Sequence, residues 1–344
     1  MKKIVLVVGI VLVIILTAVG ISIWLGSDGE DSNSDTENGI GTSTDYYIVE
    51  DAIYEKMGDT NSNAIASNMK KINAVWENYL QNNKVAFTVI PDKTYYLENQ
   101  IDTSFREIET EVANNLNSAI TYFKISDVLS LEDYYRTDMH WKQENLEKVV
   151  STILEQFNLN NEVVMQEQFT LDSEATTQEQ LETSSAEIEP PTYEEKSLGE
   201  FYGTYTTEIE NSVTPDELRY LTNAEIENSN VYSEESQTNQ PVYNLAKAEE
   251  TGNKYDVFLS GASAIETIKN ENANTGKKLI LFRDSFGSSL APLLIPYYDE
   301  IVLIDLRYVN YTILENYLDF SEYENQDVLF IYSSRVINRA GILR

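Results

Sequence analysis

The stretch KKLILFRDSFGSSLAPLL, from Lys277 to Leu294, decides the fold that we expect for this chain. Its first half holds the continuous apolar run 279–282, which is typical of a short strand buried on both faces of a sheet. Small and turn-forming residues follow from 286 to 289, and the three leucines after them indicate a helix. Ser285 therefore lies at a predicted strand-to-helix turn, just past the carboxyl end of the strand.

This place in the chain suits a nucleophile. In open α/β sheets, ligands bind in the crevice beyond the carboxyl ends of the strands. The N–H groups and the positive dipole end of the following helix stabilise an oxyanion that develops nearby. The pattern predicts Ser285 as the nucleophile of an α/β enzyme.

A serine nucleophile needs a base, and the chain contains a single histidine. This residue is His140, in YYRTDMHWKQENL, with Asp138 two residues before it and Trp141 directly after it. We predict that His140 activates Ser285 and that Asp138 fixes the tautomer of the imidazole. A plainer interpretation makes Asp138 the cap of a helix that begins near Trp141 and Ser285 a small turn residue. An aspartate and a tryptophan around the only histidine favour the catalytic interpretation.

Two of these segments, TDMHW and RDSFGSSLAPLL, together resemble the DHHW family of bacterial surface proteins. More distantly, they resemble the alginate O-acetyltransferases with an SGNH-hydrolase-like domain. Further segments agree in order from about residue 85 to the end: VAFTVIPDKTYYL, FYGTYTT, YDVFLSGAS and EIVLIDLRYV. In these families the aspartate and histidine of DxHW form a catalytic triad with the later serine, which maps onto Asp138, His140 and Ser285. Met139 stands where the family has its first histidine.

The resemblance implies an α/β fold of the SGNH-hydrolase type, with a doubly wound, mostly parallel sheet flanked by helices. The backbone N–H groups of Ser285 and Gly261 are then the expected donors to the oxyanion. The glycine loop reads Ser260, Gly261, Ala262, where relatives often have Gly-Gly-Asn, so the asparagine that helps to hold an oxyanion is absent.

Two functions from different classes remain open. The first is a membrane-anchored, extracellular serine acyltransferase or esterase that acts on acetyl groups of a cell-surface or exported polysaccharide. A transferase outside the membrane needs an acyl donor passed across it by a membrane partner. The alternative is a noncatalytic surface protein that keeps the fold and binds glycan. The Asp, His and Ser set favours the first function, and the absent asparagine favours the second.

Aromatic residues next to the predicted triad form a candidate glycan-binding platform. The chain contains 23 tyrosines and three tryptophans, and aromatic faces pack against sugar rings. Trp141, Tyr134 and Tyr135 adjoin the triad segment and are the residues expected to bind substrate. One histidine and no cysteine exclude a typical zinc site, and no cofactor is expected.

The amino terminus predicts a membrane span. Lys2 and Lys3 precede an uninterrupted apolar run from Ile4 to Leu25, about long enough to cross a hydrocarbon core of roughly 30 Å. The charge pattern predicts a cytoplasmic tip and an exported remainder. A cleaved signal peptide is the rival interpretation, but the run exceeds the usual apolar core of such peptides, about 7 to 15 residues. We therefore expect a single-pass anchor at 1–25 and a cell-membrane location.

The remaining chain is expected to contain a linker and one large domain. Residues 26–44 are polar and too poor in apolar groups to fold, and 45–344 suffice for an extracellular α/β domain. An acidic stretch at about 162–195 is expected to be a mobile excursion. The net charge of −33 excludes nucleic acid as a partner, and the absence of cysteine excludes disulfides.

Hydrophobic periodicity gives the order of elements within the domain. Helices are expected over 62–82, 104–118 and 142–157, and a short extended piece over 120–125. Strands are expected over 85–90, 201–207, 255–259, 279–282, 301–304 and 328–332, and the polar region 211–251 stays unassigned. Short apolar strands between helices are the pattern of a doubly wound sheet.

Overall fold

The computed structural model describes residues 46–97, 104–159, 191–207, 213–273 and 275–344. The predicted anchor, the linker and most of the acidic excursion lie outside these residues. Within the described ranges, no helix combines the length and the apolar character that crossing a bilayer requires.

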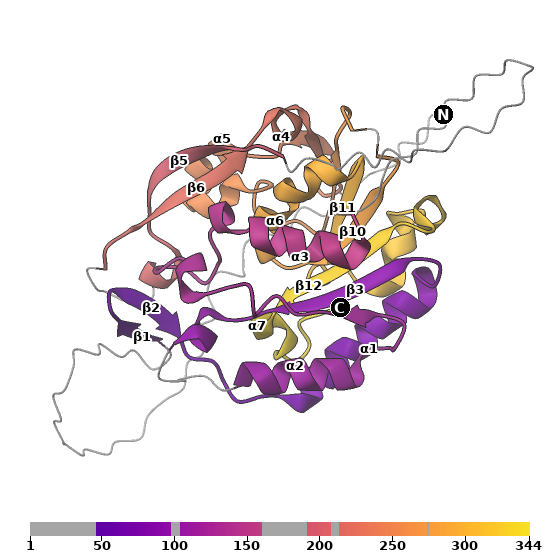
Figure 1. Ribbon diagram of the computed structural model, residues 1–344, viewed down its shortest axis with the longest axis horizontal. Coiled ribbons are helices and arrows are strands. Elements are labelled where there is room, and N and C mark those ends of the chain that lie inside the picture. Colours follow the sequence, from indigo (N-terminus) through magenta and orange to yellow (C-terminus); the bar gives the residue numbers. More distant parts are fainter. Residues whose placement is uncertain (1–45, 98–103, 160–190, 208–212, 274) are drawn as a thin grey trace, which may run out of the picture. The chain divides into compact units, whose positions relative to one another are not determined.

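An eight-stranded mixed sheet forms the centre of the domain, with strand order β4-β3-β12-β10-β11-β9-β7-β8 (Figure 1). Pairing is parallel from β4 to β11 and antiparallel from β11 to β8. The carboxyl ends of β3, β12, β10 and β11 therefore meet at one edge. The strands are β3 (Lys84–Ile90), β4 (Thr121–Tyr122), β7 (Asn230–Ser233), β8 (Thr238–Pro241), β9 (Ile265–Lys269), β10 (Lys278–Arg283), β11 (Glu300–Ile304) and β12 (Asp327–Ser333).

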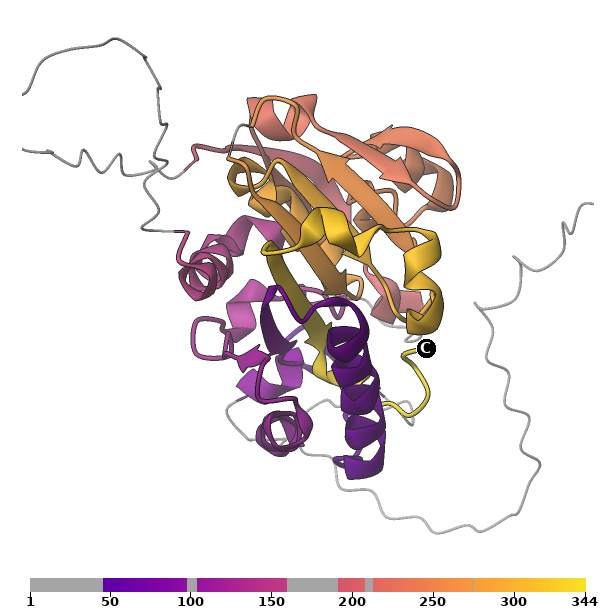
Figure 2. The ribbon, with the colours of Figure 1, turned by 90° about the vertical axis from the view of Figure 1, so that its right-hand side faces the viewer.

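Helices cover both faces of this sheet (Figures 1 and 2). Because successive strand side chains point to opposite faces, Ile280 and Phe282 belong to one core, and Leu279 and Leu281 belong to the other. The first core includes α1 (Ser62–Tyr79), α2 (Ser104–Asn115) and α7 (Ser334–Ile337), and the second includes α3 (Glu147–Phe157) and α6 (Phe286–Leu294). The α/β class with a large, mostly parallel sheet is confirmed.

Smaller elements complete the described chain. The strands β1 (Tyr46–Val49) and β2 (Ala52–Glu55) form a hairpin, and β5 (Glu194–Phe201) pairs with β6 (Asp216–Thr222). Two short helices are α4 (Ala224–Asn228) and α5 (Leu245–Thr251). The 3₁₀ turns are η1 (Lys93–Tyr96), η2 (Leu131–Asp133), η3 (Gln143–Asn145), η4 (Thr204–Thr207), η5 (Lys254–Val257), η6 (Ile295–Tyr297), η7 (Tyr311–Asn316) and η8 (Phe320–Tyr323).

Most of the strongly periodic segments form the elements that were predicted, with ends that differ by a few residues. The helix expected over 142–157 is shorter, because a 3₁₀ turn occupies its start and α3 begins at Glu147. The unassigned region 211–251 contains β6, α4, β7, β8 and α5. Their polar sequences hide the strands, because β8 is mostly exposed and β6 has polar and charged residues among its buried ones.

Three sequence predictions are wrong in the structure. The strand expected over 201–207 ends at Phe201, where β5 ends, and η4 follows. The strand expected over 255–259 is mostly η5, because the side chain of Asn253 accepts a hydrogen bond from the N–H of Tyr255 and caps a helical turn. The acidic excursion does not reach residue 195, because Glu194 and Glu195 already pair with β6.

The central strand gives a direct test of this architecture. Leu281 is fully buried in β10 and pairs with Leu303 on one side and Leu329 on the other. Leu281→Ala leaves a cavity that close-packed neighbours only partly fill, so we expect the free energy of unfolding to fall by about 2 to 5 kcal/mol. Urea unfolding measures this loss, with the 46% exposed Leu245→Ala as the control that changes little. Equal losses in the two variants would contradict the assigned core.

Candidate active site

The turn after β10 holds Ser285 in a fixed position at the start of α6. The carboxylate of Asp284 accepts hydrogen bonds from the N–H of Phe286 at 3.1 Å and from the N–H of Ser333 at 2.7 Å. These bonds tie the end of β10 to the end of β12. A side chain at Gly287 would put its Cβ 2.5 Å from the Cβ of Arg283, so this tight turn requires glycine.

The three residues predicted as a triad lie in one hydrogen-bonded chain. The Nε2 atom of His140 is 2.8 Å from the Oγ of Ser285, and its Nδ1 is 2.6 Å from the Oδ1 of Asp138. An ionised carboxylate only accepts hydrogen bonds, so Nδ1 carries the proton of a neutral imidazole. Nε2 is then free to accept the proton of the Ser285 hydroxyl. This arrangement has the geometry of an activated serine nucleophile.

Asp138 is buried but remains a strong hydrogen-bond acceptor. Its Oδ2 accepts from the N–H of Thr204 at 2.8 Å and from the hydroxyl of Thr204 at 2.9 Å. Burial disfavours its charge, but the electrostatic interaction with His140 and the hydrogen bonds from His140 and Thr204 outweigh burial and hold its pKa below the usual range. The carboxylate is therefore ionised and oriented at neutral pH.

A buried lysine holds the loop that carries Asp138. The Nζ of Lys93 donates to the carbonyls of Tyr135, Arg136 and Asp138 at 2.9, 3.1 and 2.8 Å. The side chain is 1% exposed, and Nζ lies 5.0 Å from the ring centroid of Tyr54. Burial lowers the pKa of Lys93 to about 7, although the nearby aspartates oppose this shift.

The aromatic residues predicted to bind sugar belong to the core instead. Trp141, Tyr134 and Tyr135 are 0%, 2% and 0% exposed, so they offer no ring face to a glycan, and this prediction is wrong. The indole N–H of Trp141 donates to the Oγ of Ser289 at 2.9 Å. A tryptophan can be buried when its indole N–H has a hydrogen-bond partner, as it has here. Trp141 therefore helps to fix α6 against the His140 segment.

A tyrosine that the sequence did not single out covers one face of the imidazole. The rings of Tyr255 and His140 stack with centroids 3.9 Å apart. The hydroxyl of Tyr255 lies 2.9 Å from the Oγ of Ser289, which fixes the tyrosine ring. The stacked ring restricts the orientation of His140 toward Ser285.

One of the two predicted oxyanion donors is not available. The N–H of Gly261 donates to the carbonyl of Phe258 at 3.1 Å, so this part of the prediction is wrong. The loop follows two residues with positive φ, Leu259 at 53° and Ser260 at 61°, which direct that N–H back into its own turn. The N–H of Ser285 makes no hydrogen bond within the described part of the chain and remains open to an oxyanion.

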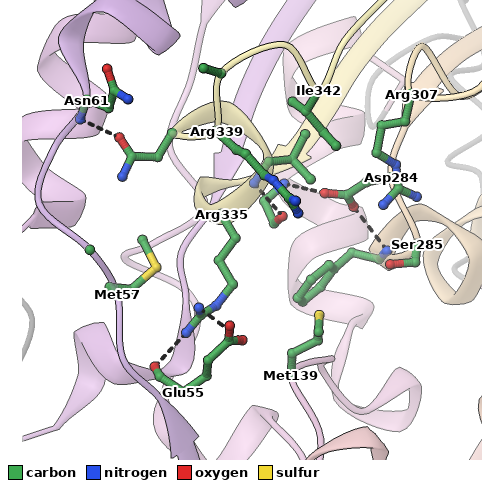
Figure 3. Close-up of a pocket in the computed structure, with 16 residues that line it drawn as sticks. Glu55, Met57, Asn61, Met139, Asp284, Ser285, Arg307, Arg335, Arg339 and Ile342 are labelled. Carbon is green, nitrogen blue, oxygen red and sulfur yellow. Dashed lines mark hydrogen bonds and ion pairs between the residues drawn. The ribbon is translucent and has the colours of Figure 1, made fainter. Parts of the chain in front are cut away.

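Ser285 opens into a cavity of about 560 Å³ between the ends of β10 and β12 (Figure 3). The cavity is also lined by Met139 and by three arginines, Arg307, Arg335 and Arg339. The described residues contain no cluster of side chains suited to a metal ion. Glu55 and Asp284 line the cavity as well, so Ser285 faces a polar space with side chains of both charges.

Several residues of the site escaped the sequence analysis. Thr204, Lys93 and Tyr255 act through hydrogen bonds or stacking that join segments far apart in the chain. The sequence indicated them only through the segments FYGTYTT, VAFTVIPDKTYYL and YDVFLSGAS, which contain them and which resemble segments of the DHHW family. Each segment contributes one side chain that contacts a residue of the triad.

The fold is similar to that of several solved structures. The chain is similar to a DHHW family protein from Eubacterium siraeum, with a TM-score of 0.62 and 20% identity, over 86% of this chain and 91% of that chain. It is also similar to PatB1 of Bacillus cereus, solved with a sulfonyl adduct, with a TM-score of 0.61 and 16% identity, over 87% of this chain and 98% of that chain. No family model and no curated protein matches the chain. The likeness confirms the DHHW-like relationship at the level of the fold.

A glycine beside Asp138 tests how closely the triad is packed. A Cβ at Gly203 would lie 2.3 Å from the Cβ of Asp138 and 2.4 Å from the carbonyl oxygen of Thr137. We expect Gly203→Ala to displace Asp138 and to lower kcat for an acetyl ester by at least about tenfold. The control is Gly199→Ala, whose positive φ of 72° adds backbone strain without any nearby atom. Equal kcat values in the two variants would contradict this packing.

Lys93 gives a prediction for stability. Lys93→Met leaves the buried carbonyls of Tyr135 and Asp138 without this donor, while the carbonyl of Arg136 keeps the N–H of Ile53, so we expect the free energy of unfolding to fall by roughly 3 kcal/mol. The folded pKa of about 7 lies below the value of about 10.4 for an unfolded lysine. The free energy of unfolding therefore contains a contribution from the neutral amine of Lys93. This contribution is fully present above about pH 10 and is lost as the pH falls toward 7.

The deficit of Lys93→Met against the wild type should therefore widen by roughly 2 kcal/mol between about pH 7 and about pH 9. Urea unfolding at both pH values measures this change. Lys70→Met, at an exposed position on α1, is the control and should show a flat difference. A Lys93→Met deficit that stays constant with pH would show that the buried amine keeps its proton throughout.

Proposed function

We propose that this protein is a membrane-anchored, extracellular serine acyltransferase or esterase. It acts on acetyl groups of a cell-surface or exported polysaccharide through an SGNH-hydrolase-like domain. The observation that carries the proposal is the contact of His140 with both partners, 2.8 Å to Ser285 and 2.6 Å to Asp138. The resemblance to O-acetyltransferases in the sequence motifs supports acetyl as the transferred group.

In the first half of the reaction, the Oγ of Ser285 attacks the acetyl carbonyl while its proton passes to the Nε2 of His140. The imidazolium is stabilised by Asp138, whose other oxygen stays fixed by Thr204. The proton then passes from Nε2 to the departing oxygen, which leaves an acetyl ester on Ser285. Each of these steps uses contacts that the free protein already has.

The negative charge on the carbonyl oxygen needs donors that point at it before the reaction starts. The open N–H of Ser285, at the start of α6, supplies one such donor together with the positive end of the helix. Gly261 does not supply the second, so another group at the cavity must do so. Of the arginines that line this cavity, Arg307 lies nearest the Ser285 end in the view of Figure 3.

The second half of the reaction decides between the two enzyme classes. His140 takes a proton from a sugar hydroxyl in a transferase or from water in an esterase, and the resulting oxygen attacks the acetyl-serine. An extracellular transferase would receive its acetyl group from a membrane partner, because an exported domain has no access to a cytoplasmic donor. The apolar run from Ile4 to Leu25 supports such a placement at the membrane.

One observation favours the noncatalytic alternative, a glycan-binding surface protein with the same fold. The N–H of Gly261 is occupied by Phe258, and no asparagine follows Gly261 to replace it. A fold with only one obvious oxyanion donor would bind glycan in the cavity and turn it over slowly or not at all. Ester hydrolysis and covalent labelling of Ser285 separate the two functions.

Removal of the nucleophile or the base tests the proposal. The two side chains act as a unit, so Ser285→Ala and His140→Ala should each lower the hydrolysis of an acetyl ester by at least about a thousandfold. The double variant should be hardly worse than either single variant. Asp138→Asn should cost a similar factor or somewhat less, because it allows the wrong tautomer of His140.

A serine-directed sulfonyl fluoride provides the second measurement, read by intact-protein mass. We expect one adduct on the wild type and none on Ser285→Ala, and Ser321→Ala serves as a distant serine control that keeps the adduct. A wild type that forms no adduct and hydrolyses no acetyl ester, while it still binds polysaccharide, would establish the noncatalytic alternative.

A further inference from the structure

Arg307 presents an open nitrogen to the cavity. It follows β11 and lines the cavity together with Ser285. Its Nε donates to both carboxylate oxygens of Asp305, at 3.0 and 3.1 Å, and its Nη2 donates to Oδ2 of Asp305 at 2.7 Å. These bonds use one side of the planar guanidinium, and Nη1 makes no hydrogen bond or ion pair with any residue that the structure describes. Figure 3 shows the guanidinium pointing toward Ser285.

The direction of this guanidinium is fixed by its surroundings. Asp305 is fully buried, its Oδ1 also accepts from the N–H of Arg307 at 2.9 Å, and Nη1 of Arg283 lies 3.9 Å from its Oδ2. The Cζ of Arg307 lies 5.3 Å from the ring centroid of Tyr308. Burial opposes the charge, but the hydrogen bonds and the charge of Asp305, together with the charge of Asp284, raise the pKa of Arg307. Nη1 is therefore a charged donor held in one direction.

A second donor to an oxyanion at Ser285 must be both open and fixed before the reaction starts. The N–H of Gly261 is not open, because it donates to the carbonyl of Phe258. Arg335 is committed to ion pairs with two carboxylates. Arg339 is exposed, and no hydrogen bond or ion pair with a described residue fixes its side chain. Of the three arginines at the cavity, Arg307 alone meets both conditions among the described residues.

We infer that Nη1 of Arg307 is the second donor to the oxyanion and takes the place of the asparagine that the glycine loop lacks. When Oγ of Ser285 bonds to the acetyl carbon, the π pair of the carbonyl moves to its oxygen and the hydroxyl proton passes to Nε2 of His140. The oxygen then accepts from the N–H of Ser285 and from Nη1 of Arg307. As the intermediate collapses, the pair returns to the carbonyl bond and the departing oxygen takes the proton from Nε2. The inference rests on the proposed acetyl chemistry and adds a catalytic residue to it.

The first test removes the guanidinium without leaving a buried charge unpaired. Arg307→Met alone would leave the carboxylate of Asp305 without its main partner, so the variant combines Arg307→Met with Asp305→Asn. With 4-nitrophenyl acetate we expect kcat to fall by about a hundredfold while KM stays within about threefold of the wild type, because the donor acts on charge that develops only in the transition state. Asp305→Asn alone keeps the guanidinium and should lose far less.

The matched control is Arg344→Met, which removes the same charge nearby. Arg344 is exposed and does not line the cavity, and its N–H donates to the carbonyl of Leu306 at 2.8 Å, next to Arg307 in the chain. This variant should keep the kcat of the wild type. Urea unfolding of all variants shows whether a change in kcat comes with a loss of stability.

Methylboronic acid separates a catalytic role of Arg307 from a structural one. It adds to a serine hydroxyl as a tetrahedral anion, so one of its oxygens occupies the position of the oxyanion. We expect its affinity to fall in the double variant by about the same factor as kcat/KM. A crystal structure of the wild-type adduct should place that oxygen about 2.7 to 3.1 Å from both the N–H nitrogen of Ser285 and Nη1 of Arg307. The adduct structure needs no variant, so it decides the matter even if the double variant does not fold.

The outcomes separate this inference from the proposed function. An unchanged kcat in the double variant, a loss that Asp305→Asn alone reproduces, an unchanged affinity for methylboronic acid, or an adduct whose oxygen lies away from Nη1 would overturn the role of Arg307. Each of these results leaves the acetyl chemistry of Ser285 intact. A wild type that hydrolyses no acetyl ester and forms no sulfonyl adduct on Ser285 would overturn the proposed function and this inference with it.

Discussion

Parallel pairing of four strands is the constraint on which the site depends. Because β3, β12, β10 and β11 all point the same way, their carboxyl ends meet at one edge of the sheet. The turns after β10 and β12 supply Ser285 and Arg335, while the turns after β3 and β11 supply Lys93 and Arg307. Chemical groups that are up to about 240 residues apart in the chain are thus adjacent without any long connecting loop. The antiparallel strands β9, β7 and β8 extend the sheet on the side away from β3 and β4.

His140 is held in a different way, because it lies in a loop with little regular structure. A buried loop must satisfy its backbone groups through side chains. Lys93 takes three of its carbonyls, and Asp216 accepts from the N–H groups of Arg136 and Thr137. One buried amine and one buried carboxylate thus replace the hydrogen bonds that a helix or strand would provide. This makes the loop rigid enough to hold an imidazole at a fixed distance from Ser285.

The sequence predicted the buried strands and the three residues of the triad. It did not predict the residues that hold the triad in place. Buried strands such as β10 and β12 are short apolar runs, and a single histidine leaves one choice of base, so Ser285, His140 and Asp138 were all identified. Polar edge strands such as β8 were missed, because they have no apolar face to show a period. Trp141 was misinterpreted, because an aromatic residue beside a catalytic one has the same sequence pattern in a sugar platform and in a core. The contacts of Lys93 are set by tertiary structure alone, and no local pattern predicts them.

The charge of the chain and the charge of the cavity act over different distances. At physiological ionic strength, the field of an exposed charge is screened within about 8 Å. The acidic surface therefore governs solubility and the approach of other macromolecules, whereas binding beside Ser285 depends on the few groups within that distance. At the cavity, Arg335 pairs with both Asp92 and Glu55, and Arg307 pairs with Asp305. Ligand binding at the cavity therefore depends on the donors and acceptors that these ion pairs leave open, and the net charge of −33 does not by itself decide it.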